Sequence, residues 1–290
     1  MIETYAYARA GLLGNPSDGY YGKTIAFLLR NFRVRVLLYP SARLEIKPSK
    51  ADMPVFENLD DLYSTTRWRG YYGGIRIIQA LIVRFIDYCH ECGRDLDDRN
   101  FTLEYESTIP LRLGMGGSSA IITAALRALC QYFSVDIPRP IQAKLALETE
   151  TKELGVPAGP QDRVIQVYEG LVYMDFARDL MERQGYGYYE NLDPALLPNM
   201  YVAYRTSLSE GTEIFHSNVR ERWRAGEPQV VEAMQTWAGY AEQGREALLR
   251  RDPATLGRLI DANFNLRAKV YRISDGNVRM IQAARQVGAT

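Results

Sequence analysis

Three glycines fall within four residues of this sequence, at Gly114, Gly116 and Gly117, and Ser118 and Ser119 follow directly. Glycine lets a backbone approach a ligand closely and adopt positive φ. The first N–H groups of a helix have no intrahelical partner and carry partial positive charge, which suits phosphate oxygens. An apolar helix is expected behind the serines, so the segment predicts a rigid phosphate-binding loop. The alternative is a flexible glycine loop with a serine helix cap.

A second segment carries carboxylates that could serve phosphoryl transfer. On a predicted helix at 141–153, Glu150 and Glu153 share one face and Glu148 does not. A carboxylate on that face could hold Mg²⁺, although a solvated acidic face is the simpler interpretation. Asp162 follows a loop rich in glycine and proline. It could orient or deprotonate a substrate hydroxyl, or cap the next helix.

The hydrophobic pattern predicts the elements that must hold these residues. Alternating apolar residues indicate strands, and apolar residues spaced three or four apart indicate helices. We expect strands at 5–13, 32–38, 44–46, 101–105, 170–176 and 201–204, helices at 75–92, 118–133, 141–153 and 163–168, and mostly helix from 212 to 284. This order predicts an α+β lobe followed by a helix-rich lobe, with a boundary near 175–195.

Composition narrows the possible partners. The 290 residues carry 35 basic and 35 acidic side chains, so no nucleic acid is expected as a partner. No apolar run approaches the about 18 residues of a membrane span, so no membrane is expected either. The first residues lack the features of a signal peptide and cysteines are few, which together predict a cytoplasmic protein.

One cysteine pattern has an alternative reading. Cys89 and Cys92 form a C-x-x-C, which could be half of a zinc site or a redox pair. A structural zinc needs four ligands, and the remaining Cys130 and His216 form no second pair with ligand spacing. The simpler interpretation is the end of a helix that stops before Gly93.

The glycine segment resembles a known family motif. Residues 110–120 read P-L-R-L-G-M-G-G-S-S-A and closely resemble the second motif of GHMP kinases, P-x-x-x-G-L-G-S-S-A. The resemblance implies an α+β, two-lobed GHMP kinase-like fold, with an N-terminal lobe like ribosomal protein S5 at 1–180 and a helical lobe at 181–290. It implies ATP and Mg²⁺ as cofactors. The implied ATP-binding residues are Gly114, Gly116, Gly117, Ser118 and Ser119.

The same resemblance assigns further roles. In these kinases a glutamate five residues before a glycine binds Mg²⁺, which implies Glu150 together with Ser118. The Gln161-Asp162 pair resembles that of the sugar-1-kinases and implies a catalytic Asp162. Residues 8–18 resemble the first family motif, which implies that Arg9 acts beside this aspartate. The residues implied to line the sugar site are Asn15, Ser17 and Asp18.

Several segments over nearly the whole chain look like those of glucuronokinases, among them G-P-Q-D-R at 159–163 and G-Y-Y-G-G at 70–74. This implies an enzyme, monomeric or homodimeric, that phosphorylates the anomeric hydroxyl of D-glucuronate. A uronate needs a cationic partner, ideally arginine; Arg163 is the candidate, with an ion pair to Glu150 or Glu153 as its alternative. Tyr72 could pack on the sugar.

Other functions stay open at this point. One is a kinase for another sugar, such as galacturonate or a heptose, and another is a non-catalytic homologue that binds a sugar or a nucleotide. The family carries a third glycine-rich motif near its C-terminus. This sequence ends at 286–290, where that motif would begin, so we expect the helical lobe to lack it.

Overall fold

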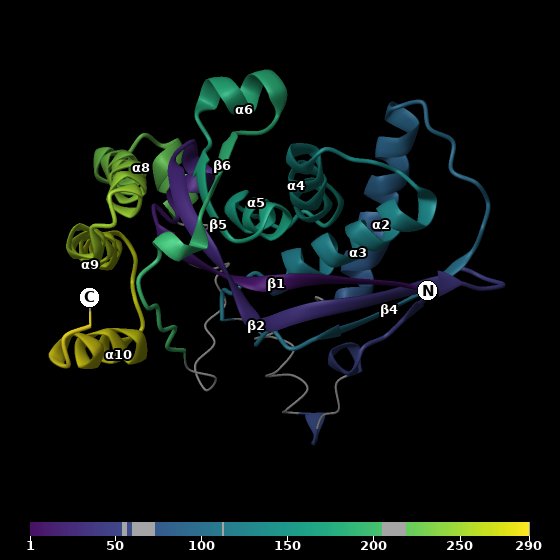
Figure 1. The fold of residues 1–290 in the computed structure, drawn as a ribbon, viewed down its shortest axis with the longest axis horizontal. Helices are drawn as coiled ribbons and strands as arrows, with labels where there is room; N and C mark the ends of the chain where they lie inside the picture. Colours follow the sequence, from purple (N-terminus) through teal and green to yellow (C-terminus); the bar gives the residue numbers. More distant parts are fainter. Residues whose placement is uncertain (54–56, 60–72, 112, 205–218, 290) are drawn as a thin grey trace. The chain divides into compact units, whose positions relative to one another are not determined.

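The computed structural model describes residues 1–53, 57–59, 73–111, 113–204 and 219–289. Two compact units are present: unit 1 comprises Met1–Ala8 and Leu29–Val167, and unit 2 comprises Arg9–Leu28 and Tyr168–Thr290 (Figure 1). The expected division into 1–180 and 181–290 assumes a single cut in the chain. Each observed unit instead contains two separate stretches of the chain, because the first two strands each contribute residues to both units.

Unit 1 is a sheet covered by helices. Its strands are the first part of β1 (Ile2–Leu13), the last part of β2 (Lys23–Pro40), β3 (Glu45–Lys47) and β4 (Phe101–Ser107). β2 pairs with β4 in antiparallel register from Val34↔Ser107 to Pro40↔Phe101, and β3 pairs with β4 in parallel. β1 pairs with β2. Short 3-10 turns lie at η2 (Lys50–Asp52) and, in unit 2, at η1 (Ser17–Tyr20) and η4 (Pro194–Leu196).

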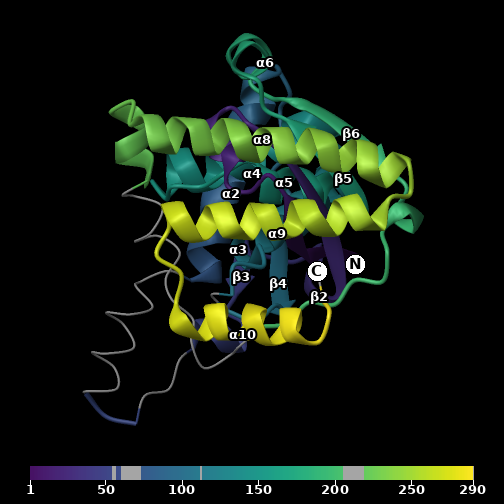
Figure 2. The same ribbon diagram turned by 90° about the vertical axis from the view of Figure 1, so that its left-hand side faces the viewer.

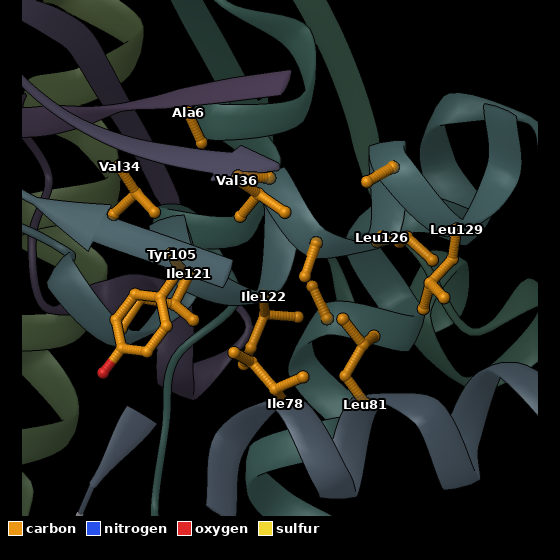
Figure 3. Packing of buried hydrophobic residues seen from close by; sticks show 14 of the residues in the cluster. Ala6, Val34, Val36, Ile78, Leu81, Tyr105, Ile121, Ile122, Leu126 and Leu129 are labelled. Carbon is orange, nitrogen blue, oxygen red and sulfur yellow. The ribbon is translucent and has the colours of Figure 1, made fainter. Parts of the chain in front are cut away.

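The helices of unit 1 are α2 (Gly74–Glu91), α3 (Gly117–Phe133), α4 (Arg139–Glu148) and α5 (Gln161–Tyr168). Of these, α2, α3 and α4 share one hydrophobic core with the sheet. Figure 3 shows Val34 and Val36 of β2 pointing toward Ile122 and Leu126 of α3, with Ile78 of α2 beyond them. Each such buried aliphatic side chain contributes about 1.5–3 kcal/mol. This core fixes α3, and with it the glycine loop at its N-terminus.

Unit 2 combines the start of β2 with a small sheet and long helices. Lys23–Phe27 of β2 pairs antiparallel with β5 (Leu171–Asp175), which pairs with β6 (Tyr188–Leu192). The helices are α6 (Arg178–Gln184), α8 (Pro228–Leu249), α9 (Pro253–Val270) and α10 (Asp275–Gln286). α8 and α9 pack side by side (Figure 2). Trp237 of α8 is fully buried, and its Nε1 donates a hydrogen bond to the Asn263 carbonyl of α9 at 3.2 Å.

Most predicted elements are confirmed, but the strand at 201–204 and the start of β2 differ, and α6 and β6 were not predicted. The helix at 75–92 and its stop before Gly93 correspond to α2, whose C-cap is Cys92. The strand predicted at 201–204 is wrong, because those residues form no regular structure. β2 begins at Lys23, nine residues before the predicted start at 32 (32 − 23). In the described part of the chain, no helix combines the length and the apolar character that crossing a membrane requires.

Candidate active site

The glycine loop adopts the geometry that its residues allow. Gly114 and Gly116 have φ of +65° and +74°, where side chains other than hydrogen are strained, and α3 begins at Gly117. The first backbone hydrogen bond of the helix runs from the Ala120 N–H to the Gly116 carbonyl at 3.1 Å. Within the residues that the structure describes, the N–H groups of 117–119 are not used by the protein's own backbone. They are available to an anion.

The carbonyl of Gly116 accepts the side-chain hydrogen bonds that hold this loop in place. Gln166 Nε2 donates to it at 2.7 Å and to the Tyr7 carbonyl at 3.1 Å, and Ser119 Oγ donates to it at 3.1 Å. Ser119 is fully buried. Its hydroxyl therefore fixes the loop, and a contact of Ser119 with phosphate would have to use its backbone N–H.

A π-turn, η3 (Thr149–Glu153), follows α4 and sets the direction of the glutamates. The Leu154 N–H reaches the Thr149 carbonyl at 3.3 Å, five residues back. Because this turn is wider than an α-helical turn, Glu148 and Glu153 both face Arg84 of α2, at 3.5 and 3.8 Å. The prediction that Glu150 and Glu153 share a face is thus wrong.

Glu150 instead faces the glycine loop. Ser118 Oγ donates a hydrogen bond to Glu150 Oε1 at 2.7 Å, and the glutamate is only 2% exposed. The two residues predicted to hold Mg²⁺ are therefore in direct contact, although they lie 32 residues apart in the chain.

Arg163 joins the two acidic residues of the site. Its guanidinium forms an ion pair with Glu150 and lies 3.8 Å from Asp162 Oδ2, and its Nη1 donates to the Gly159 carbonyl at 2.7 Å. The Arg163 side chain is 6% exposed, whereas that of Asp162 is 18% exposed. The structure thus forms the ion pair that was the alternative for Arg163, and its side chain is buried away from a substrate carboxylate.

The donor set suits a hard cation. Mg²⁺ prefers oxygen ligands and is commonly held by one or two protein groups together with substrate phosphates. Ser118 and Glu150 supply a hydroxyl and a carboxylate oxygen beside open helix N–H groups. Among the described residues, no group of three or more His, Cys, Asp or Glu could hold a metal ion alone. The arrangement fits a cation that arrives with a nucleotide.

The residues predicted to contact a sugar lie in unit 2. The loop before η1 contains a cis peptide bond between Asn15 and Pro16. Ser17 is fully buried, and its hydroxyl bonds the backbone of Lys23, accepting from N at 3.1 Å and donating to O at 2.9 Å. Ser17 therefore supports the loop and does not present its hydroxyl to a sugar. Asp18 is 8% exposed, and Tyr72 lies outside the described residues.

One arginine near this loop was missed in the sequence. Arg267 of α9 donates from Nη1 to Asn15 Oδ1 at 3.0 Å. Arg9 and Asp18 both interact with it electrostatically. In unit 2, the structure thus brings Asn15 into contact with Arg267 of the C-terminal helices, and Arg9 and Asp18 act on the charge of that arginine. The structure groups Ser118, Glu150, Asp162 and Arg163 in unit 1.

Replacing Gln166 with methionine should weaken ATP binding about 3- to 10-fold, because it removes the side-chain donor that holds the Gly116 carbonyl. Calorimetry with a non-hydrolysable ATP analogue measures the change in Kd. Gln142→Met is the matched control, since Gln142 Nε2 makes a similar bond to the Ile137 carbonyl at 2.7 Å, at the start of α4. Equal effects of the two substitutions would contradict a specific role for Gln166.

Comparisons with known proteins show which family the chain resembles. Residues 80–170 match the family described as GHMP kinases N terminal domain. The chain is 42% identical to "Probable glucuronokinase 2" of Arabidopsis thaliana, over 100% of this chain and 80% of the relative. It is 40% identical to "Glucuronokinase 1" of the same plant, over 99% and 81%. The solved structure of a Lin0012 protein from Listeria innocua matches with a TM-score of 0.74 at 15% identity, over 99% and 85%.

The chain belongs to the GHMP kinase family. The expected α+β fold of that family is confirmed. The protein is an ATP-dependent kinase whose phosphate acceptor is an alcohol group.

Proposed function

We propose that this protein transfers the γ-phosphoryl group of ATP to the anomeric hydroxyl of D-glucuronate, giving glucuronate 1-phosphate and ADP. The observation that carries the proposal is the contact between Ser118 and Glu150 at 2.7 Å, beside the open N–H groups at the start of α3. The names of the two Arabidopsis relatives, at 42% and 40% identity over almost the whole chain, support the choice of sugar.

The reaction assigns a task to each group. A bond forms between the anomeric oxygen and the γ-phosphorus while the bond from that phosphorus to the β–γ bridging oxygen breaks. The hydroxyl proton passes to the Asp162 carboxylate, which acts as general base. An anomeric hydroxyl is more acidic than an ordinary alcohol, so a base of modest strength is sufficient. Arg9 stabilises the charge on the transferred group.

The nucleotide is held by the glycine loop. The N–H groups of Gly117, Ser118 and Ser119 bind its phosphates. Ser118 and Glu150 would hold Mg²⁺, which would neutralise part of the phosphate charge when bound. Arg163 keeps the Glu150 carboxylate in place through their buried ion pair. The geometry in unit 1 therefore supports positioning and charge stabilisation, the two contributions that phosphoryl transfer needs most.

An assay that couples ADP release to NADH oxidation tests the proposal on a panel of sugars. We expect the highest kcat/KM with D-glucuronate, dependence on Mg²⁺, and glucuronate 1-phosphate as the product in phosphorus NMR. A higher kcat/KM with galacturonate, a heptose or mevalonate would assign a different acceptor. Calorimetric binding of glucuronate and nucleotide without ADP release would indicate a non-catalytic homologue.

A further inference from the structure

Arg267 lies on the face of α9 that contacts the loop before η1. Its Nη1 donates to Asn15 Oδ1 at 3.0 Å, and its Cζ lies 4.9 Å from the centroid of the Tyr271 ring. Four residues earlier on the helix, Asn263 Oδ1 accepts a hydrogen bond from the Gly14 N–H at 3.0 Å. Residues four apart share a helix face. The helix therefore fixes both the loop and the position of the Arg267 side chain.

The charges around Arg267 differ from those around Arg222 and Arg245 of the same unit. Arg222 and Arg245 form salt bridges of 2.5 and 2.6 Å, whereas Arg267 forms none within the described parts of the chain. Partial removal from water lowers the pKa of the Arg267 guanidinium, and Arg9 lowers it further, while Tyr271 and Asp18 act in the opposite direction. Among the described residues, the Arg267 guanidinium thus lacks the close carboxylate partner that Arg222 and Arg245 have.

A desolvated cation with incomplete counter-charge is costly to the folded protein unless an anion compensates it. Within the described ranges of the chain, one N–H donor of Arg267 forms a hydrogen bond, to Asn15, and a guanidinium has five. The remaining donors suit a carboxylate, which a guanidinium binds in a bidentate way. The buried Arg163 is not available to bind the substrate carboxylate, because its guanidinium already forms an ion pair with Glu150.

We infer that Arg267 binds the carboxylate of the sugar acid and so determines the preference of this enzyme for uronates over uncharged sugars. The inference rests on the proposed function, which supplies an acceptor with a carboxylate. Asn15, which the family resemblance assigns to the sugar, contacts Arg267 directly, and Asp18, which the resemblance also assigns to the sugar, favours the charged form of this arginine. The preference for uronates therefore depends on a residue of α9 as well as on the loop of the first motif.

The test compares D-glucuronate with D-glucuronamide, which has nearly the same size and no charge at the carboxyl position. In the full chain, Arg267→Met should lower the ratio of the two kcat/KM values about 10- to 150-fold, the range expected for a hydrogen bond to a charged group. Arg267→Lys keeps the charge and loses the bidentate geometry, so its ratio should lie between those of wild type and Arg267→Met. Arg258→Met, at an exposed position of the same helix, should leave the ratio unchanged.

The outcomes separate three roles. Equal losses on both substrates would mean that Arg267 only positions Asn15, and a higher KM for ATP with an unchanged ratio would mean that it binds phosphate; either result overturns the inference. If circular dichroism shows that Arg267→Met is unfolded, Arg267→Lys decides, since an unchanged ratio there also overturns it. Wild-type protein that turns over neither substrate would refute the proposed function itself, and the inference with it.

Discussion

Asp162→Asn should lower kcat by about 10²- to 10⁴-fold while the Kd of ATP changes little. The amide has the shape of the carboxylate but accepts no proton, so the contribution of a positioned general base is lost. The Asp162 side chain is 18% exposed, so the substitution should not disturb the buried core. Steady-state kinetics with glucuronate and calorimetry with a nucleotide analogue measure the two quantities.

The control for this substitution is Asp136→Asn, at an exposed position of unit 1. It should leave both kcat and the Kd of ATP within about twofold, because it changes the same chemical group outside the site. A kcat for Asp162→Asn within about threefold of wild type would remove Asp162 from the chemical step. Stabilisation of charge by Arg9 and the glycine loop would then have to account for the rate.

Arg163→Met should destabilise the protein by about 3–5 kcal/mol, because it leaves the carboxylate of Glu150 buried without its cation. Glu150 is 2% exposed, and both partners lie in unit 1. Denaturant unfolding measures the free energy. Activity should fall as well, since the arginine that holds Glu150, the proposed Mg²⁺ ligand, is missing.

The double variant Glu150→Gln/Arg163→Met distinguishes stability from chemistry. Removing both charges removes the uncompensated one, so the double variant should be more stable than Arg163→Met. Its kcat should nevertheless stay low, because the amide is a poor ligand for Mg²⁺. If the free-energy changes of the two single variants, Glu150→Gln and Arg163→Met, add up to that of the double variant, the two side chains have no coupling in the folded protein.

The parts of the fold that follow from local pattern were predictable. The helix at 118–133 and the strand at 101–105 match α3 and β4 within two residues at each end, because one face of each element is apolar. The first part of β2 was missed because residues 24–27 are all buried. Strands buried on both faces do not alternate. The π-turn was not predicted, because the sequence pattern of 141–153 gives no sign that the hydrogen bond of Leu154 N–H reaches five residues back to Thr149.

The residues of the candidate site also fall into those that a local motif predicts and those that it does not. Ser118, Glu150 and Asp162 belong to motifs that can be read locally, and the structure brings them together in unit 1. Arg267 has no such signal, because its contact with Asn15 joins residues 252 apart. The available hint was that Asn263 and Arg267 are polar residues four apart in a segment predicted to be mostly helical. Such a hint becomes informative only when the partner loop is known.

The pairing of β2 with β5 has a consequence for synthesis. Phe27 pairs with Leu171, which follows it by 144 residues (171 − 27). At a translation rate of about 5–20 residues per second, this apolar segment waits about 7–30 s on the ribosome before its partner emerges. Unit 2 cannot begin to fold from its own N-terminal residues during that time. Soluble expression should therefore respond strongly to chaperone supply, and amino-terminal fusions that shield the nascent segment should raise the yield.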